Sequence, residues 1–333
     1  MKKVISFICL LTLNSLLFPM NAQQKTDTTL VYVHQEKASF KSKFFQSMAS
    51  IFRVKKYIEK NITKHTYDQS IAPIPRSIRK NFIIHKDSLL KRQIFILEPK
   101  QNTSEKVILY LHGGAYYWNI SKYNWSFAEE LIKETSATII IPDYPLAPSA
   151  TCEDLYDFMN ELYQQLISTH HHKNISIIGE SAGGGLALGF SMLLRDQNTP
   201  QPHQLILLAP WLDVTMSNPE ILKIDKKDKI LGIKGLQLAG KGYAGKMNVT
   251  DYKVSPINGD LSNLPQTSIF IGTHDIFVAD ARRLKNKAHA SGVPLRYYEY
   301  PKMFHIWILV KKLKEAKHAR KQIVSLLLAK NSN

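Results

Sequence analysis

The chain has 333 residues, 44% of them hydrophobic, and its 44 Lys and Arg against 27 Asp and Glu give a net charge of +17. This length accommodates one large α/β domain with insertions or two small domains. Gly and Pro number 15 each, so neither disorder nor a repeat array is indicated. The basic residues are spread out and no nucleic-acid motif accompanies them, so we expect no nucleic-acid partner. The charge favours a solvated surface, with weak association with anionic envelope surfaces as the alternative.

Residues 1–22 have the pattern of an export signal. Lys2 and Lys3 precede an almost unbroken apolar run from Val4 to Phe18, and Ala22 is the candidate last residue before cleavage. The run is shorter than the roughly 20 residues that span a bilayer, which favours a cleaved signal over a signal anchor. We therefore expect export to the periplasm or beyond. Cys152 is then the single cysteine, so no intramolecular disulfide is expected, and it should pack at a helix start.

Residues 23–75 predict an N-terminal helical segment. The stretch Phe40–Ile62 has helical spacing, so that one face would carry Phe44, Met48, Ile51, Phe52 and Ile58. Pro73 and Pro75 then break the pattern. We expect this segment to pack over the domain that follows and to contribute to a cap.

Strands and helices alternate over residues 76–333. Eight strands are predicted, at 81–85, 92–97, 107–111, 137–141, 175–178, 204–208, 267–271 and 295–300. The first two should pair through a turn near residues 86–88. Helices are predicted at 125–134, 153–167, 182–195, 279–290 and 308–328. This order requires a mostly parallel sheet covered on both faces. Residues 213–260, rich in Gly and Lys, interrupt the alternation and predict a cap insertion.

A nucleophile elbow is predicted where the strand 175–178 meets Gly179-Glu180-Ser181-Ala182-Gly183 and a run of small residues. A G-x-S-x-G sequence between a strand and a helix holds its serine on a strained turn. A Cβ at Gly179 or Gly183 would collide with neighbouring backbone. Ser181 is therefore the candidate nucleophile.

The loop His112-Gly113-Gly114-Ala115 directly follows the strand 107–111. The tetrahedral intermediate of acyl transfer needs backbone N–H donors, and losing one typically costs roughly 3–4 kcal/mol of barrier. Small residues allow that close approach, so Gly114 and Ala115 are candidate donors, together with Ala182 just after the serine. We expect His112 to shape this loop through hydrogen bonds rather than to act as a base. The alternative is an ordinary turn.

An acid and a base are predicted after two later strands. Asp275 follows the strand 267–271, at an edge where α/β sites assemble. The competing carboxylate, Asp280, lies in the first turn of the next helix, where negative charge is favourable for the helix itself. His305 follows the strand 295–300 and could exchange a proton with Ser181.

The other histidines fit less well. His274 adjoins the acid and should point away from it, and we expect the run His170–His172 to form an exposed loop rather than a metal site. The chain order Ser181, Asp275, His305 is that of α/β hydrolases and differs from both serine-protease orders.

These motifs resemble the hormone-sensitive-lipase branch of the α/β-hydrolase superfamily, which includes many bacterial carboxylesterases. The match runs from about Lys106 to the C-terminus and rests on H-G-G-A at 112–115, D-Y-P-L-A-P at 143–148, G-E-S-A-G-G at 179–184, W-L-D after Pro210, S-P at 255–256, G-T-H-D at 272–275 and His305. The resemblance implies an α/β-hydrolase fold, with an eight-stranded, mostly parallel sheet, flanking helices and a helical cap. It also implies ester hydrolysis through an acyl-enzyme, without metal or cofactor.

The sequence departs from the family pattern at several positions. The third glycine of the family's loop is Ala115 here, which is acceptable if that position needs only an N–H donor and not a positive φ. The Arg and Glu that brace the family's Y-R-L-A-P-E turn are Pro145 and Ser149, and Gly185 stands where Asn is common. None of these touches the candidate Ser, His and Asp, but they leave subfamily and substrate open.

We therefore expect an exported serine ester hydrolase acting on small or medium esters. The candidate pocket residues are aromatic, with core packing as the alternative for each: Tyr116, Tyr117, Trp118 and Trp211. Deacetylation of acetylated glycans or related envelope molecules is one alternative function. A non-catalytic ligand-binding protein on the same scaffold is another. Acyl length and oligomeric state stay open.

Overall fold

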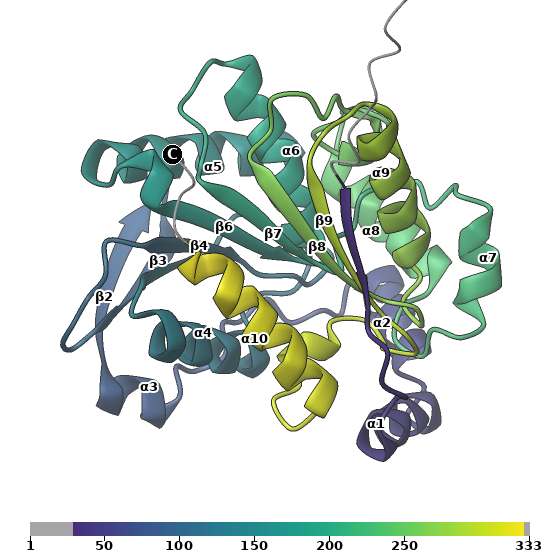
Figure 1. Cartoon of the computed structure of the whole chain (residues 1–333). Coiled ribbons are helices and arrows are strands. Elements are labelled where there is room, and N and C mark those ends of the chain that lie inside the picture. The colour runs from purple at the N-terminus through teal and green to yellow at the C-terminus, as the bar shows by residue number, and fades with distance from the viewer. Residues whose placement is uncertain (1–28, 330–333) are drawn as a thin grey trace, which may run out of the picture.

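The computed structural model describes residues 29–329, so the predicted signal at 1–22 lies outside the described residues. Within them, nine strands form one sheet in the order β1-β9-β8-β7-β6-β4-β5-β3-β2 (Figure 1). The strands are β1 Thr29–Val33, β2 Phe82–Leu89, β3 Arg92–Pro99, β4 Val107–Leu111, β5 Thr138–Pro142, β6 Ile175–Glu180, β7 Gln204–Leu208, β8 Gln266–Gly272 and β9 Leu295–Tyr300. The pairs of β2 with β3 and of β3 with β5 are antiparallel, and all other neighbours are parallel.

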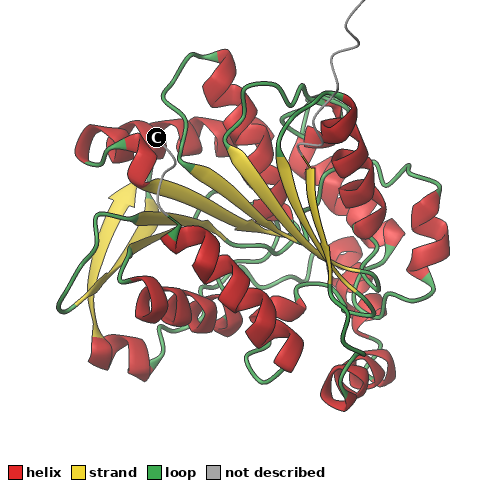
Figure 2. Cartoon of the chain, viewed as in Figure 1, coloured by secondary structure: helices red, strands yellow, loops and turns green. Residues whose placement is uncertain are grey.

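Helices cover both faces of this sheet (Figure 2). The α-helices are α1 Phe40–Ile51, α2 Val54–Lys64, α3 Arg76–Asn81, α4 Lys122–Thr135, α5 Cys152–Thr169, α6 Ala182–Asp196, α7 Glu220–Asp225, α8 Ile233–Ala244, α9 Val278–Ala290 and α10 Lys314–Leu328. Three short 3-10 helices lie within residues 29–329: η1 His172–Asn174, η2 Pro256–Asn258 and η3 Trp307–Leu309. One hydrophobic cluster lies between the sheet and α5, α6, α8 and α9, and a second lies between the sheet and α3, α4 and α10. β4, β6 and β7 are buried along their whole length, as expected of parallel strands covered on both faces.

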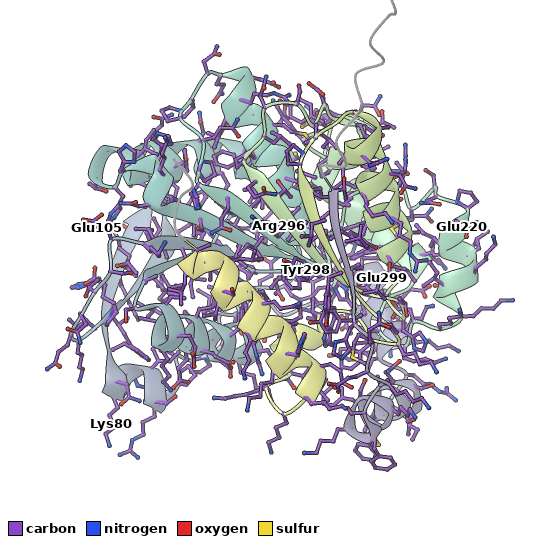
Figure 3. All side chains as sticks on the ribbon, in the orientation of Figure 1. Lys80, Glu105, Glu220, Arg296, Tyr298 and Glu299 are labelled. Carbon is purple, nitrogen blue, oxygen red and sulfur yellow. The ribbon has the colours of Figure 1, made fainter. Side chains whose placement is uncertain are left out.

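The eight predicted strands are all present, and β1 adds a ninth at the edge. β1 pairs in parallel with β9, and the following residue, His34, donates its N–H to the carbonyl of Glu299 over 2.9 Å. Figure 3 labels Tyr298 and Glu299 on β9, beside this strand. Leu30, Val31 and Val33 are 40–55% exposed. β1 therefore lacks the alternation of buried and exposed residues on which strand prediction depends.

The predicted turn at residues 86–88 is wrong. β2 continues through these residues to Leu89, which pairs with Arg92, so the turn consists of Leu90 and Lys91. Both have positive φ, 47° and 64°, the geometry that matches the twist of a two-residue hairpin. Residues 86–88 are of types common in turns, but this part of β2 is exposed, so the strand tolerates polar side chains there.

The single helical stretch predicted over 40–62 is two helices. Arg53, with φ 51°, separates α1 from α2. The shared apolar face predicted to pack on the domain is only partly correct, because Phe44, Ile51 and Phe52 are 56–69% exposed while Ile58 of α2 is half-buried. The buried residues of α1 are instead the small Ser42 and Ala49.

Residues 213–260 contain α7 and α8, and α2 packs against α8. Lys55 of α2 forms a 2.5 Å ion pair with Asp225. A Cβ placed on Gly235 of α8 would lie 3.1 Å from the Cα of Glu59 of α2, so the two helices approach closely. Of the helices within residues 29–329, none combines the length and the apolarity that crossing a bilayer requires.

Trp125 of α4 joins the N-terminal segment to the sheet, and its removal tests that joint. The ring is fully buried, lies edge-on to Phe95 with centroids 5.1 Å apart, and donates to the carbonyl of Ala72 over 2.7 Å. We expect Trp125→Ala to lower the free energy of unfolding by about 3–5 kcal/mol in denaturant titrations. Leu222→Ala, at a side chain that is 65% exposed, should change it by less than about 0.5 kcal/mol. Equal effects of the two substitutions would contradict this packing.

Candidate active site

Ser181 lies on a sharp turn between β6 and α6, with φ 53° and ψ −119°. A non-glycine residue rarely adopts a positive φ, and such strain persists only where the surroundings enforce it. A Cβ on Gly179 would lie 2.1 Å from the carbonyl oxygen of Gly183, and one on Gly183 would lie 2.2 Å from that of Leu111. The predicted collisions are therefore confirmed, and the two glycines let β6, α6 and β4 approach closely enough to hold the turn.

Ser181, His305 and Asp275 form a chain of hydrogen bonds. The Nε2 atom of His305 lies 3.0 Å from the Oγ atom of Ser181, and its Nδ1 atom lies 2.8 Å from the Oδ2 atom of Asp275. All three side chains are buried. They follow β6, β8 and β9, which are parallel, so their carboxyl ends meet at one edge of the sheet. The structure thus brings together the three residues that the sequence singled out.

The charges around His305 favour its protonated form more than water does. Burial lowers the pKa of His305, but the charge and hydrogen bond of Asp275, together with the charges of Asp228 and Glu180, outweigh burial. The pKa of His305 therefore lies above its ordinary value of 6.5. A second oxygen of Asp275, Oδ1, accepts the N–H of Phe277 over 3.0 Å, which fixes the carboxylate.

Asp228, in the loop between α7 and α8, was not singled out from the sequence. It is buried, its Oδ2 atom accepts the N–H of Ile276, and its Oδ1 atom accepts those of Ile230 and Leu231, all at 2.8–2.9 Å. Burial first, and the charge of Asp275 second, raise the pKa of Asp228 to about 6. One carboxylate therefore ties the insertion to the loop that carries Asp275.

Glu180, the residue before Ser181, binds the loop that follows β4. Its Oε1 atom accepts the N–H of Gly113 and the side-chain amide of Asn124, both over 2.7 Å. Burial raises the pKa of Glu180 despite these donors. The sequence carries one signal for this role, an acidic residue inside an otherwise small and apolar motif.

The loop after β4 contains backbone N–H groups that have no acceptor among the described residues. Gly114 has φ 110° and Ala115 has φ 52°. None of the hydrogen bonds formed within residues 29–329 uses the N–H of Gly114 or of Ala115. Ala182 is the first residue of α6, where the N–H lacks an intrahelical acceptor. Gly114 and Ala115 line the same cavity as Ser181, and Ala182 directly follows the serine in the chain.

Alanine at position 115 was expected to be acceptable if this position did not need a positive φ. The φ of Ala115 is positive, so this condition is not met. The left-handed region costs an L-residue about 1–2 kcal/mol more than it costs glycine. Alanine occupies this position all the same, since Tyr117 and Trp118 donate their N–H groups to the carbonyl of Gly114 over 2.8 and 2.9 Å and close the turn around it.

His112 shapes this loop through a hydrogen bond, as predicted. Its Nδ1 atom lies 2.7 Å from the carbonyl oxygen of Gly113, and its ring stacks on Tyr144 with centroids 4.2 Å apart. Burial lowers the pKa of His112 to about 4, so the ring is neutral at pH 7. The hydroxyl of Tyr144 also donates to the carbonyl of His112.

An arginine still stabilises the turn at 143–148, although Pro145 and Ser149 replace the family's Arg and Glu. Arg92 of β3 binds the carboxylate of Asp143 and donates to its carbonyl over 2.8 Å. The arginine comes from another part of the chain, so the local motif did not reveal it. Gly185 has no room for the family's Asn, since a Cβ there would lie 2.1 Å from the carbonyl oxygen of Trp211.

A cavity of about 220 Å³ lies beside Ser181 and is mostly apolar. It is lined by Ile58, Gly114, Ala115, Trp118, Glu180, Ser181, Ile230, Leu231, Leu236, His305 and Ile306. Of the four aromatic residues predicted for the pocket, Trp118 lines it. The other three do not line it and instead pack in the core: Tyr116 on Tyr243, Tyr117 against Tyr67, and Trp211 on Phe277. The backbone reverses after Gly114 and turns Tyr116 toward Tyr243 of α8 and Tyr117 toward Tyr67 of the N-terminal segment.

The remaining candidate residues lie away from Ser181. His274 lies with its Nδ1 atom 2.8 Å from Gln46 of α1, pointing away from the acid. Asp280 is in the first turn of α9, as predicted, but it is buried and its pKa is raised to about 6. Cys152 is buried as the first residue of α5, as predicted, and its pKa is raised to about 12 by burial.

No group of three His, Cys, Asp or Glu side chains within residues 29–329 is arranged to hold a metal ion. The side chains of the run 170–172 form local hydrogen bonds instead: His172 donates to the carbonyl of Gln201 over 2.7 Å, and the Nδ1 atom of His171 accepts the N–H of Lys173 over 3.3 Å. His171 is exposed and the two flanking histidines are half-buried.

The influence of Asp228 on the imidazole can be measured directly. Asp228→Asn removes a negative charge that favours the protonated ring, so we expect the pKa of His305 to fall in an NMR titration of the histidine side chains. Asp280→Asn is the matched control, because Asp280 is also buried but does not act on His305. An unchanged or higher pKa of His305 in Asp228→Asn would contradict the assignment.

Relatives of this chain are esterases and related hydrolases. An esterase of Acinetobacter venetianus is 31% identical over 215 residues, covering 62% of this chain and 71% of the relative. An acetyl-hydrolase of Streptomyces hygroscopicus is 27% identical over 203 residues, covering 61% and 68%. A solved esterase of the bacterial hormone-sensitive lipase family superposes with a TM-score of 0.73 over 88% of this chain and 98% of that chain; at 21% identity it shows the fold.

Together these matches make the protein an ester hydrolase of the carboxylesterase and lipase type. The family model described as alpha/beta hydrolase fold matches residues 108–309, which hold Ser181, Asp275 and His305. The chain therefore belongs to the α/β-hydrolase fold family.

Proposed function

We propose that this chain is an exported serine carboxylic-ester hydrolase that works through an acyl-enzyme on small or medium esters. The observation that carries the proposal is the hydrogen-bonded chain from Ser181 through His305 to Asp275, set beside unpaired backbone N–H groups. The signal-like pattern of residues 1–22 supports export.

In the proposed acylation step, the Oγ atom of Ser181 attacks the ester carbonyl while the Nε2 atom of His305 takes its proton. At 3.0 Å these atoms are within proton-transfer distance. His305 then gives this proton to the departing alkoxide, which leaves as the alcohol. A water molecule attacks the acyl-enzyme in the second half, with His305 again as the base, and the acid is released.

Two sets of groups stabilise the charges that form. Gly114, Ala115 and Ala182 supply N–H donors for the oxyanion, and they are fixed before the substrate arrives, so no reorganisation is needed during the reaction. Asp275 orients the imidazole by accepting its Nδ1–H and stabilises the imidazolium once it forms. Asp228 accepts the N–H of Ile276 and so holds the loop that carries Asp275 in place.

The size of the cavity supports short acyl groups. At about 220 Å³ it is smaller than the roughly 300–1,000 Å³ pockets that hold drug-sized ligands. Its apolar lining, including Ile58 and Leu236, suits an aliphatic chain rather than a charged group. The same small volume favours a second candidate function, removal of acetyl groups from glycans or related envelope molecules, and the Streptomyces relative is named an acetyl-hydrolase.

Substitution of the candidate nucleophile tests the proposal. We expect Ser181→Ala to lower kcat by at least about 10⁴-fold on a short-chain chromogenic ester, because the attacking atom is removed. Ser191→Ala is the matched control, since this buried hydroxyl of α6 binds Gln201 and should leave kcat within about twofold. Undiminished turnover by Ser181→Ala would refute the proposal. A panel of acetyl to long-chain esters and acetylated sugars separates the two candidate functions.

The pH dependence of kcat/KM follows from the raised pKa of His305. The imidazole must be neutral to act as a base, so activity is lost as the pH falls through its pKa, which lies above 6.5. We expect the acid limb of the profile to have its midpoint above 6.5, and to shift to lower pH in Asp228→Asn. Full activity well below pH 6 in the parent protein would contradict His305 as the base.

A further inference from the structure

We propose that α1 and its surroundings form a docking surface for a bilayer that carries anionic lipids. This surface, called the α1 surface below, consists of exposed apolar side chains and a rim of lysines. Its apolar members are Phe40, Phe44, Ile51, Phe52, Tyr57 and Tyr123. Its lysines are Lys41, Lys43, Lys56, Lys122, Lys311 and Lys312. The proposal concerns binding and stands independently of the catalytic one.

The orientation of α1 is the reverse of an ordinary surface helix. Helical spacing places Phe40, Phe44 and Ile51 on one side, and these side chains are 82%, 56% and 68% exposed. The opposite side, which carries Ser42 and Ala49, is the one buried against the domain. A helix normally turns its apolar stripe toward the core. In the isolated protein the stripe of α1 is in contact with water, which is unfavourable, and a partner that covered the stripe would remove this contact.

An apolar groove continues the α1 surface toward α4 and α10. It has a volume of about 450 Å³ and is lined by Phe44, Phe45, Tyr123, Leu309, Val310 and Leu313, together with lysines. Figure 1 shows α1 at the lower right, beside the loop that leads into α10. The groove thus extends the exposed apolar area beyond a single helix.

The charge around this apolar area is strongly positive. Between residues 37 and 65 the only acidic residue is Glu59, which pairs with Lys234. The same stretch carries eight basic residues: Lys37, Lys41, Lys43, Arg53, Lys55, Lys56, Lys60 and Lys64. Lys55 is committed to Asp225, but Lys41, Lys43, Lys56 and Lys60 are exposed.

Aromatic rings flanked by lysines are the composition of helices that lie in the interface of an anionic bilayer. Phe and Tyr insert among the acyl chains and head groups, while lysines bind the phosphates around them. A protruding helix with both features on one side matches a planar surface. The weak attraction to anionic envelope surfaces expected from the net charge is thereby located at one side of the molecule.

The buried side of α1 contacts the loops of the active site. Gln46 donates to the carbonyl of Lys302 over 3.0 Å and lies 2.8 Å from His274, next to Asp275. Phe45 stacks on Phe304, next to His305, with centroids 5.5 Å apart. Docking through α1 would therefore place the edge of the sheet that carries Ser181 close to the membrane.

Vesicle flotation tests the proposal. The parent and all variants are prepared in the same processed form, with the N-terminus read by mass spectrometry, and mixed with phosphatidylcholine vesicles with or without phosphatidylglycerol. We expect the parent to float with the anionic vesicles, and less so at high salt. The triple variant Phe40→Ser, Phe44→Ser, Phe52→Ser should lose about tenfold or more in binding. Lys41→Gln, Lys43→Gln, Lys56→Gln should lose the preference for anionic lipid.

Matched controls carry the same kinds of substitution elsewhere. Leu90→Ser with Leu222→Ser changes apolar side chains of similar exposure, 62% and 65%. Lys80→Gln with Lys91→Gln changes exposed lysines; Lys80, labelled in Figure 3, lies on α3 on the other side of the view from α1. These variants should bind like the parent. Activity on a soluble short-chain ester should be unchanged throughout, which shows that each variant is folded.

Several outcomes would overturn the proposal. One is binding by the aromatic variant equal to that of the parent, and another is an equal loss in the controls. A parent that ignores vesicles but forms a dimer that the aromatic variant abolishes would make the α1 surface an interface between two copies. Binding that depends on residues 1–22 and not on the aromatic residues would assign the affinity to the N-terminal segment.

Discussion

The strained turn at Ser181 is the constraint on which the rest of the site depends. A positive φ at a serine is unfavourable, and it persists because α6, β6 and the end of β4 approach within distances that exclude a Cβ at positions 179 and 183. The turn directs the hydroxyl toward His305 and leaves the N–H of Ala182 unpaired at the start of α6. A looser turn would separate the hydroxyl from the imidazole and the donors together.

Buried carboxylates hold the loops around that turn. Glu180 binds Gly113 and so fixes the loop of N–H donors, while Asp228 binds Ile276 and so fixes the loop of Asp275. Both are desolvated and raise the pKa of His305. A charge buried in this way is costly unless hydrogen bonds satisfy it, and each of these carboxylates accepts at least two. Residues 213–260 thereby take part in the site, through Asp228 and through Ile230, Leu231 and Leu236, which line the cavity beside Ser181.

The sequence was informative where local pattern and local chemistry coincide. The strands β4–β9 and Ser181, Asp275 and His305 could be placed because buried parallel strands are largely apolar and site residues follow their carboxyl ends. The antiparallel strands β2 and β3 could be placed because each is rich in apolar and β-branched residues. The sequence did not predict the features that depend on contacts between residues far apart in the chain. β1 has no alternation, the hairpin turn lies at Leu90 rather than at polar residues, and Tyr116 turns into the core. Asp228 and Arg92 act across long sequence separations, so no short motif contains them, and the positive φ of Ala115 is imposed by the loop around it.

The most direct test of the account is to identify the nucleophile chemically. A fluorophosphonate reacts with a serine only when a neighbouring base activates it, and peptide mass spectrometry then locates the label. We expect one label per chain, on Ser181, and its loss in His305→Ala, a variant in which the hydroxyl remains but the base does not. A label on another residue, or full labelling of Ser181 without the imidazole, would contradict the proposed site.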